Sequence, residues 1–563
     1  MSTVDAARSA SSADELERRL AALQAELAGV KAEMAAKVSS LEDTVTDLAH
    51  ENALLKRRLY GKRTERSFTS ELQLSIGDLL ATETKLQAEL DAAAARAEQA
   101  AAAATEGKPD GEPRAKRSGH GRRNLFASKL PRYVIEIVDA EREEQGCRRI
   151  GFDDSPQLAF RPGGFYVLVK RIARYEVIED GAATVVAPPA PATLFPKALL
   201  HTSTVAHLLT SKFALGVPHY RLEQALEEQG MSLDRGLMSR YVEHAGNTLG
   251  ATIVAAMWRD AIADGHVIST DATGALIQPT KAKDGRSLGC KKGHFFTAVV
   301  DLRAVLFAYA EHHTSDTVET LFAGFGGYLQ ADASAVYDVL DRGPPVDTDD
   351  GVKLVGCWAH ARRYFFEAAI CRHPAGVQGL LRIRAIYAAE RAERRMPRDE
   401  RAAFRATHMR PLIDDFFTWV HAVRDTVAGR NLATKALGYA LNQEAELRRV
   451  LDDVSLPLDN TRAERALRKI VVGRKNWLFY GSDTHAEAAA AIFSLIASCR
   501  LHRLDPFTYF DEVLRVLPYW PRDRYLELAP ANWAATRGRL DPDELSLPIA
   551  SFTVPEAPAP APP

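Results

Sequence analysis

Three acidic residues stand in segments that make them candidates for holding a metal ion. Asp271 lies near the end of the apolar run HVISTDATGALIQP, and Asp332 follows the apolar residues of GYLQAD. Glu464 lies four residues before Arg468, on the same face of an expected helix, so an acid and a guanidinium can point into one cleft. Carboxylates are preferred ligands of Mg²⁺ and Mn²⁺, whose other positions take water and phosphate oxygens. The three acids therefore predict a metal site for phosphate chemistry.

Each acid also has a simpler interpretation when it is taken alone. Asp271 fits a turn, Asp332 fits a helix cap, and Glu464 fits an ion pair on the surface of a helix. Only the joint placement of the three acids among the expected strands and helices favours the metal site.

Residues 266–369 contain the elements that must position the two aspartates. Their apolar patterns predict three strands, a helix, a strand, a helix, a strand and a helix, in that order. This is the order of a ribonuclease-H-like α/β domain. In that arrangement Asp271 on the first strand and Asp332 at the end of the fourth are neighbours. Asn460 is placed to cap the helix that carries the third acid.

Cations and aromatic rings close to the third acid suit a DNA end, because cations hold phosphates while rings stack on unpaired bases. Trp477 is one of these aromatic residues, and the alternative to stacking on a base is that its ring is buried beneath the sheet. A basic linker carries further cations, and a solvated hinge is the alternative interpretation of this linker. A helix–turn–helix-like pattern carries others, and a helical hairpin without any DNA role is the alternative for this pattern. The candidate DNA contacts are Arg122, Arg123, Arg235, Arg240, Arg468, Arg474, Lys475 and Trp477.

His360 and Arg362 follow the last expected strand, in GCWAHARRYF. At the exit of that strand His360 is placed to face the cleft and contact phosphate or an acid, and a packed core histidine is the equal alternative. Cys357 lies inside the apolar strand with no cation that clearly activates it, so core packing accounts for it better than a nucleophilic role.

The N-terminal segment has the pattern of a coiled coil. Apolar residues recur in steps of three and four from Leu16 to Leu59, and Asn52 falls at a seam position where a buried amide fixes register. A long helix packed on its own chain is the alternative, but the apolar stripe is narrow and favours a partner helix. The pattern predicts a homo-oligomer, at least a dimer.

Composition limits the remaining classes of protein. The chain has 563 residues, with 72 Lys and Arg against 74 Asp and Glu and 46% hydrophobic residues, which predicts a globular protein of several domains. No run reaches the roughly 18 apolar residues of a membrane span, and the N-terminus lacks an apolar signal core. We therefore expect a cytoplasmic protein with no membrane partner. The five cysteines contain no C-x-x-C pair, so they suggest neither a disulfide framework nor a zinc cluster.

The chain resembles the large transposase of the insertion-sequence sixty-six family, whose members are DDE transposases with a ribonuclease-H-like catalytic core. The resemblance rests on STDATG, GYLQADASAVYD, GCWAHARRYFFEA and DNTRAERALRKIVVGRKNWLFYGS. It implies that Asp271, Asp332 and Glu464 are the catalytic triad and hold Mg²⁺ or Mn²⁺. It also implies binding of terminal inverted repeats and target DNA in the nucleoid, and small accessory proteins encoded by the element as further partners.

The small β-rich module departs from the family pattern. That module commonly binds zinc through two cysteine pairs, whereas here Cys147 stands alone in GCRRIG and the place of the second pair reads RYEVIED. One thiolate cannot complete a tetrahedral site, so no zinc is expected.

The expected function is Mg-dependent DNA cleavage and strand transfer by a DDE transposase. A catalytically inactive DNA-binding regulator derived from a transposase and a ribonuclease-H-like nuclease are the alternatives. The expected domains are a coiled coil at 1–67, a helix and basic linker at 68–132, a degenerate zinc-finger-like β-rich module at 133–192, a helical, helix–turn–helix-like DNA-binding region at 193–260, a ribonuclease-H-like α/β catalytic domain at 261–500 with a helical insertion at about 376–454, a C-terminal helical extension at 501–550 and a disordered tail at 551–563.

Deleting residues 1–60 tests the coiled coil. The shortened protein should form a lower-order species in light scattering and lose the pairing of two DNA ends, because the seam that joins the chains is gone. Asn52→Leu should stabilise the coil and loosen its choice of partner number. An unchanged mass after the deletion would contradict the coil as the oligomerising element.

Overall fold

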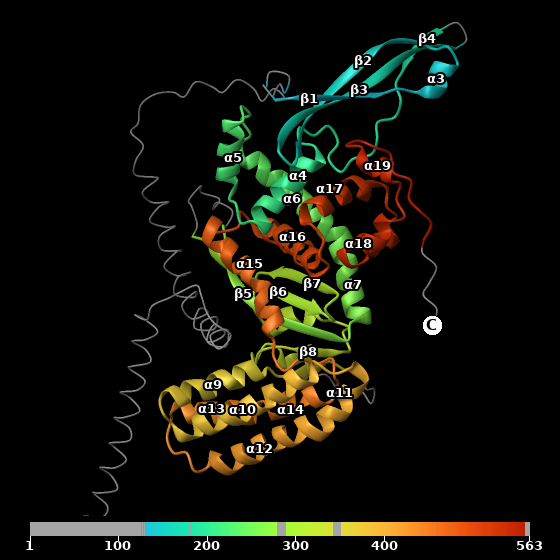
Figure 1. The fold of residues 1–563 in the computed structure, drawn as a ribbon. Helices are drawn as coiled ribbons and strands as arrows, with labels where there is room; N and C mark the ends of the chain where they lie inside the picture. The colour runs from blue at the N-terminus through green and yellow to red at the C-terminus, as the bar shows by residue number, and fades with distance from the viewer. Residues whose placement is uncertain are drawn as a thin grey trace, which may run out of the picture. The chain divides into compact units, whose positions relative to one another are not determined.

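A computed structural model describes residues 125, 128, 130–179, 182–278, 289–341 and 351–557. These residues form two compact units (Figure 1). The helical unit comprises Trp358–Glu444, and the larger unit comprises the described residues up to Cys357 and from Ala445 onward. The predicted coiled coil, Arg122 and Arg123 lie outside the described residues. Within the described ranges, no helix has both the length and the apolar character needed to cross a membrane.

A four-stranded sheet opens the larger unit. A long hairpin dominates it, in which Arg161 pairs with Gly164 across the turn and the two strands stay in register over most of their length. One strand adds to this hairpin in parallel and another in antiparallel orientation, which gives the order β1-β3-β2 with β4 on β3. The strands are β1 (Arg132–Ile137), β2 (Arg148–Arg161), β3 (Gly164–Glu179) and β4 (Ala182–Val186).

Helices follow the hairpin sheet. Asp234 starts α6 by accepting hydrogen bonds from the backbone N–H groups of Gly236 and Leu237, as an N-cap aspartate does. Further along α6, Gly246 lies so close to α16 that an added Cβ would stand 2.6 Å from the Ala488 carbonyl oxygen, so only glycine allows this approach. The helices are α4 (Thr202–Leu209), α5 (His219–Glu228), α6 (Arg235–Leu249) and α7 (Ala255–Asp264), with π-helical turns at Thr210–Ala214 and Gly250–Val254.

The second sheet has five strands in the order β7-β6-β5-β8-β9 (Figure 1). The first three strands along the chain pair antiparallel, and β5, β8 and β9 pair parallel. Helix α8 (Ser315–Leu321) connects β7 to β8, and after β8 the described residues contain a 3₁₀ turn at Asp338–Leu340 where the sequence predicts a helix. The strands are β5 (Val267–Ile277), β6 (Lys291–Val300), β7 (Ala304–Ala310), β8 (Tyr328–Gln330) and β9 (Lys353–Val355).

Helix α16 (Asp483–Leu501) covers the β7 edge of this sheet. Its Ser494 and Ser498 hydroxyls accept hydrogen bonds from the backbone N–H groups of Phe307 and Val305, at 2.8 and 3.0 Å. An exposed strand edge would present these donors to other chains, so the two serines close the edge from within the same chain.

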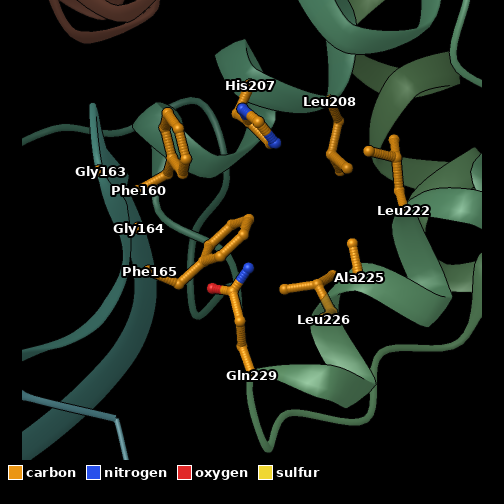
Figure 2. A pocket seen from close by; sticks show the side chains of 10 residues that line it. All are labelled: Phe160, Gly163, Gly164, Phe165, His207, Leu208, Leu222, Ala225, Leu226 and Gln229. Atoms are coloured by element: carbon orange, nitrogen blue, oxygen red, sulfur yellow. The ribbon is translucent and has the colours of Figure 1, made fainter.

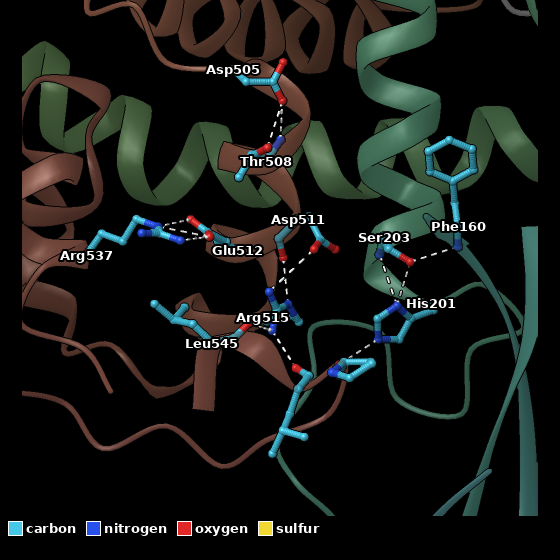
Figure 3. A network of polar contacts seen from close by, with 12 residues as sticks. Phe160, His201, Ser203, Asp505, Thr508, Asp511, Glu512, Arg515, Arg537 and Leu545 are labelled. Atoms are coloured by element: carbon cyan, nitrogen blue, oxygen red, sulfur yellow. Dashed lines mark hydrogen bonds and ion pairs between the residues drawn. The ribbon is translucent and has the colours of Figure 1, made fainter. Parts of the chain in front are cut away.

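The C-terminal region packs back onto α4 through a polar network (Figure 3). His201, which precedes α4, donates from Nε2 to the Pro548 carbonyl (3.0 Å) and accepts at Nδ1 from the Ser203 N–H (3.2 Å). Burial lowers the pKa of His201 to about 4, so the ring is neutral at pH 7 and fits this arrangement. Arg515 donates to the carbonyls that end α19. The helices are α17 (Pro506–Val516), α18 (Pro530–Arg537) and α19 (Pro542–Ser546).

The packed chain continues past the last helix. Residues 551–557 contain no helix or strand, but Phe552 is buried and its ring meets Tyr519 at 5.7 Å between centroids. Phe552 therefore packs against the C-terminal region, within the tail that the sequence analysis expects to be disordered.

The helical unit has its own aromatic core. Trp358 and Phe365 from its first helix pack edge-on against Phe416 on a later helix. The buried Arg405 guanidinium also pairs with the Glu393 carboxylate at 2.8 Å. The helices are α9 (Trp358–Ile370), α10 (Pro374–Glu393), α11 (Arg398–Phe404), α12 (Arg410–Arg424) and α13 (Leu432–Asn442), with α14 (Glu444–Arg448) at the return to the larger unit.

Candidate active site

Asp271 lies within β5, and Asp332 follows the end of the adjacent parallel strand β8. Ser269 on β5 pairs with Gln330 on β8, which is the last pair of this ladder. Asp271 is two residues further along β5, and Asp332 is two residues past the end of β8, so both residues follow the last pair of the same ladder. The prediction that the strands of these residues are neighbours is confirmed.

The chain folds back directly after Asp332. The Asp332 carboxylate accepts a hydrogen bond from the Ser334 N–H (3.2 Å), and the Tyr337 N–H donates to the Ser334 carbonyl (3.1 Å). These two bonds return Tyr337 beneath the aspartates, where it is 2% exposed. Burial raises the pKa of Tyr337, a side-chain hydrogen bond with Thr270 acts in the opposite direction, and the negative charges of Asp332 and Asp271 raise it further.

Glu464 reaches this region on helix α15 (Thr461–Trp477), whose start is fastened to β5. The Asn460 side-chain amide donates to the Thr270 carbonyl at 2.6 Å, one residue before Asp271. The Asn460 carbonyl in turn accepts from the Glu464 N–H at 3.3 Å. Glu464 is 8% exposed and stands one helical turn, about 6 Å, from this anchor.

Asn460 therefore occupies the capping position with a different function from the predicted one. Its side chain makes no hydrogen bond to the helix that it precedes. The amide spans the gap to the sheet instead, and the Asn460 N–H donates to the Cys357 sulfur at 3.3 Å. Cys357 is fully buried, in line with the packing function expected for it.

The other end of α15 is fastened to the same strand. Arg474 donates to the Thr273 hydroxyl at 3.1 Å. Leu478, at a φ of 65°, ends the helix and turns the chain toward Tyr480. The Tyr480 backbone then bonds to Leu276 and Gln278 at the end of β5. Helix α15 is thus held along β5 at both ends, which fixes Glu464 between these attachments.

Buried polar atoms lie near the aspartates. Within the described ranges, the Asn460 Oδ1 atom is buried and makes no hydrogen bond, and the buried hydroxyls of Thr270 and Tyr337 interact with each other. Such atoms cost roughly 1–3 kcal/mol each unless water or an ion satisfies them. The donor set therefore fits a hydrated divalent cation held by Asp271 and Asp332. In the described parts of the chain, no three His, Cys, Asp or Glu side chains are already arranged as a ligand set.

His313 is a site residue that the sequence analysis missed. It lies in the loop after β7, stacked on His294 with ring centroids 5.4 Å apart. Its Nε2 atom is buried and has no hydrogen-bond partner among the described residues. Burial lowers the pKa of His313, and the negative charge of Asp332 acts against this shift. Loop histidines carry no periodic signal, so only the folded chain reveals that His313 lies near Asp332.

Family profiles match most of the chain. The profile described as Transposase IS66 family covers residues 197–488, which include Asp271, Asp332 and Glu464. The chain belongs to the IS66 transposase family. The profiles described as IS66 C-terminal element and Transposase C of IS166 homeodomain match residues 494–531 and 47–135. Membership implies a transposase, an enzyme that binds and processes DNA.

This transposase is also similar to proteins of Sinorhizobium fredii (strain NBRC 101917 / NGR234). The uncharacterised protein y4qI is 27% identical over 533 residues, which cover 92% of this chain and 94% of y4qI. The uncharacterised protein y4jD is 26% identical over 533 residues, which cover 88% of this chain and 96% of y4jD. The similarity therefore extends over nearly the whole transposase.

The cationic candidates for DNA contact in the transposase form two groups, one exposed to solvent and one buried. Arg468 and Lys475 on α15 are exposed, and so are Arg235 and Arg240 on α6. None of these four cations is in an ion pair with any described residue. Arg474 differs, because it is 6% exposed and burial lowers its pKa to about 10. Arg474 therefore holds α15 on the sheet, while the other four cations are exposed.

Trp477 of the transposase is partly buried among side chains of its own chain. Its ring folds back over Gly473, where an added Cβ would stand 2.4 Å from the ring, so this position requires glycine. The ring also meets Phe213 edge-on at 5.9 Å, and the Lys212 ammonium lies 5.6 Å from its centroid. These contacts support the packing alternative, and stacking on a DNA base stays a prediction.

His360 and Arg362 lie on α9 in the helical unit of the transposase. His360 is 8% exposed, and burial lowers the pKa of Arg362. The proposed approach of either side chain to the acids stays a prediction.

A pocket of about 320 Å³ opens between the hairpin turn and helices α4 and α5 of the transposase (Figure 2). Phe160 stacks on His207 at 3.9 Å between ring centroids, and Phe165 meets the same ring edge-on. Burial lowers the pKa of His207 to about 4, so this ring is neutral at pH 7. Leu222, Leu226 and Gln229 line the opposite wall. The lining is mainly apolar and stands apart from the two aspartates.

Asn460→Ala should lower the free energy of unfolding by about 1–3 kcal/mol, because the buried Thr270 carbonyl loses its donor. Asn476→Ala is the matched control, since Asn476 lies on the same helix and donates to the Gly216 carbonyl from an exposed position (2.8 Å). Water replaces that bond, so the control should cost much less. Urea denaturation of both variants checks the difference, and equal losses would contradict the anchoring function of Asn460.

Proposed function

We propose that this protein is a DDE transposase with a ribonuclease-H-like catalytic core. The observation that supports this most strongly is the placement of Asp271 on β5 and of Asp332 just past the adjacent parallel strand β8, next to a helix that is anchored one residue from Asp271 and carries Glu464. The strand order, with three antiparallel strands followed by two parallel ones, is the order expected of such a core. Acids at strand ends on rigid elements can be held in catalytic geometry.

The proposed reaction is cleavage at the ends of an insertion sequence, followed by joining of the freed 3′-hydroxyl to target DNA. Asp271, Asp332 and Glu464 would hold Mg²⁺ or Mn²⁺, which when bound lowers the pKa of water and neutralises phosphate charge. The protein's own contribution is to present three carboxylates from two strands and one helix, and to keep them partly shielded from solvent. In-line attack by an activated hydroxyl requires no covalent bond between protein and DNA.

The proposed DNA path follows the exposed face of α15. Arg468 and Lys475 are exposed, four and eleven residues after the buried Glu464, so all three side chains lie along the same face of this helix. Arg235 and Arg240 at the start of α6 would contact the terminal inverted repeats, as the second helix of a helix–turn–helix does. Binding of the DNA phosphates to these cations would place the scissile bond close to the three acids.

Assembly and location complete the proposal. Two ends must be brought together for transposition, so we propose at least a dimer, joined by the coiled coil predicted at 1–67. Small accessory proteins encoded by the element are proposed as further partners, and the nucleoid as the place of action. The β-rich module is proposed to hold without zinc, because its core residues Leu158, Val167 and Tyr175 are fully buried.

A non-catalytic DNA-binding derivative is the second candidate. The observation that favours it is the lack, in the described ranges, of three side chains already arranged as metal ligands. DNA binding without any Mg-dependent cleavage of element ends would identify this alternative.

Replacing Asp271, Asp332 or Glu464 by Ala should abolish cleavage of element ends and leave end binding largely intact, because only the chemical step loses its ligand. Glu319→Ala is the control, since Glu319 is an exposed acid on α8. Gel assays of cleavage and of binding with Mg²⁺ measure the two effects separately. Cleavage that survives in all three variants would refute the proposed triad.

Lys475→Ala and Arg474→Ala should behave differently although the residues are adjacent. Loss of the exposed Lys475 charge should weaken end binding and reduce the salt slope by about one unit. Loss of the buried Arg474 should mainly lower the melting temperature, because α15 loses its bond to Thr273. Binding isotherms at several salt concentrations and a melting curve check both outcomes. If only Arg474→Ala reduced the salt slope, the assignment of DNA contact to Lys475 and of packing to Arg474 would be contradicted.

A further inference from the structure

The helical unit carries a surplus of positive charge. Residues 358–444 contain 15 Lys and Arg, of which 14 are Arg, against 9 Asp and Glu. The difference of these two counts is a net charge of +6, in a chain whose net charge is −2. A local surplus of this kind attracts polyanions where the cations share one surface.

Part of this surplus lies on the exposed side of α10. Arg384 and Arg391 are seven residues apart, nearly two helical turns, so their exposed side chains lie on the same side of the helix. Arg395 is exposed in the turn that follows α10, four residues after Arg391. None of the exposed residues of α10 is an acid. We call Arg384, Arg391 and Arg395 the arginine stripe.

The two acids of α10 face inward. Glu390 and Glu393 are 5% and 2% exposed and pair with Arg394 and Arg405 at 2.7 and 2.8 Å. A solvent-facing helix ordinarily mixes both signs of charge on its outer side. Here both negative charges are paired with other arginines, and the arginine stripe makes no ion pair with any described residue. The stripe therefore presents its positive charge to solvent without compensation from its own helix.

Like charges also lie close together beside the stripe. Burial lowers the pKa of Arg362 on α9, Tyr387 acts in the opposite direction, and the positive charge of Arg391 lowers it further. Arg391 is therefore held near a second guanidinium, and the two repel each other. A bound anion would relieve this repulsion.

We propose that the arginine stripe binds the phosphate backbone of duplex DNA without reading its sequence. This inference rests on the proposed function, because it takes DNA as the partner, and it adds a contact surface on the helical unit. Arg384 and Arg395 are eleven residues apart, which corresponds to about 16 Å along a helix axis. Roughly five phosphates of one DNA strand occupy that length, so each guanidinium can meet a phosphate. The planar fork of arginine suits this contact, since it donates to two phosphate oxygens at once.

A triple variant of the full chain, with Arg384→Gln, Arg391→Gln and Arg395→Gln, tests the proposal. The salt slope for binding a duplex unrelated to the element should fall by about three units, one for each lost contact. A duplex with the element ends should show the same reduction, because backbone contacts carry no sequence information. Fluorescence anisotropy of both duplexes at several salt concentrations, without divalent metal, measures the slopes.

Arg430→Gln is the matched control for a loss of net charge. Arg430 is exposed between α12 and α13, outside the stripe, and makes no ion pair with the described residues. The control should leave both slopes unchanged. Cations near the end of α10 can also stabilise the helix dipole, an effect that lowers the melting temperature on removal and leaves the salt slope as it was. Arg384 lies far from that end, so Arg384→Gln alone should reduce the slope by about one unit at an unchanged melting temperature.

An unchanged salt slope in the triple variant would overturn the inference. Equal reductions in Arg384→Gln and Arg430→Gln would also overturn it, because net charge alone would then explain them. A reduction confined to element ends would refute binding without sequence reading. If the triple variant changed only the mass in light scattering, the stripe would be a protein contact and the inference would be wrong.

Lys475→Ala separates failure of this inference from failure of the proposed function. If Lys475→Ala weakens end binding while the triple variant binds as the original protein does, only the inference on the stripe is overturned. If the original protein binds neither duplex, the proposed function fails, and the inference fails with it.

Discussion

The hydrogen bond from the Asn460 amide to the Thr270 carbonyl holds the candidate site together. It joins two segments that are 190 residues apart in the chain, at a point buried from solvent. In a dry environment such a bond is expensive to break, because the carbonyl would be left without a donor. Asp271 follows this bond directly on the strand, and Glu464 follows it one turn along the helix. The distance between the two acids therefore depends on this contact together with the attachments at the far end of α15.

The rest of the larger unit keeps that contact in place. Arg474 and Tyr480 fasten the far end of α15 to the same strand, so the helix cannot swing about Asn460. On the edge of the sheet, Ser494 and Ser498 bind the strand β7 to α16. Backbone and side-chain polar groups, more than ion pairs, make these connections. They are short-range and directional, which suits elements that must hold acids within a fraction of an ångström.

Buried polar groups divide into those that the fold uses and those that it leaves open. His201 and Arg515 have complete sets of partners in the C-terminal network, and they stabilise the packing of that region (Figure 3). The Thr270 and Tyr337 hydroxyls interact with each other near the aspartates. Buried polar atoms without a hydrogen bond also occur elsewhere in the described residues, as at Thr202 and His219.

The sequence by itself determined the order of strands and helices around the two aspartates, because alternating and continuous apolar runs report directly on burial. It also indicated the family, through motifs that span most of the chain. Only the tertiary structure decided how single side chains are used. Arg474 and Lys475 are adjacent cations in the sequence, yet one is buried and the other exposed, because successive helix positions face different surroundings. Asn460 bonds to the sheet and not to its own helix, and Tyr337 and His313 lie beside Asp332 through a turn and a loop. Contacts between distant segments leave no local pattern, so the sequence cannot reveal them.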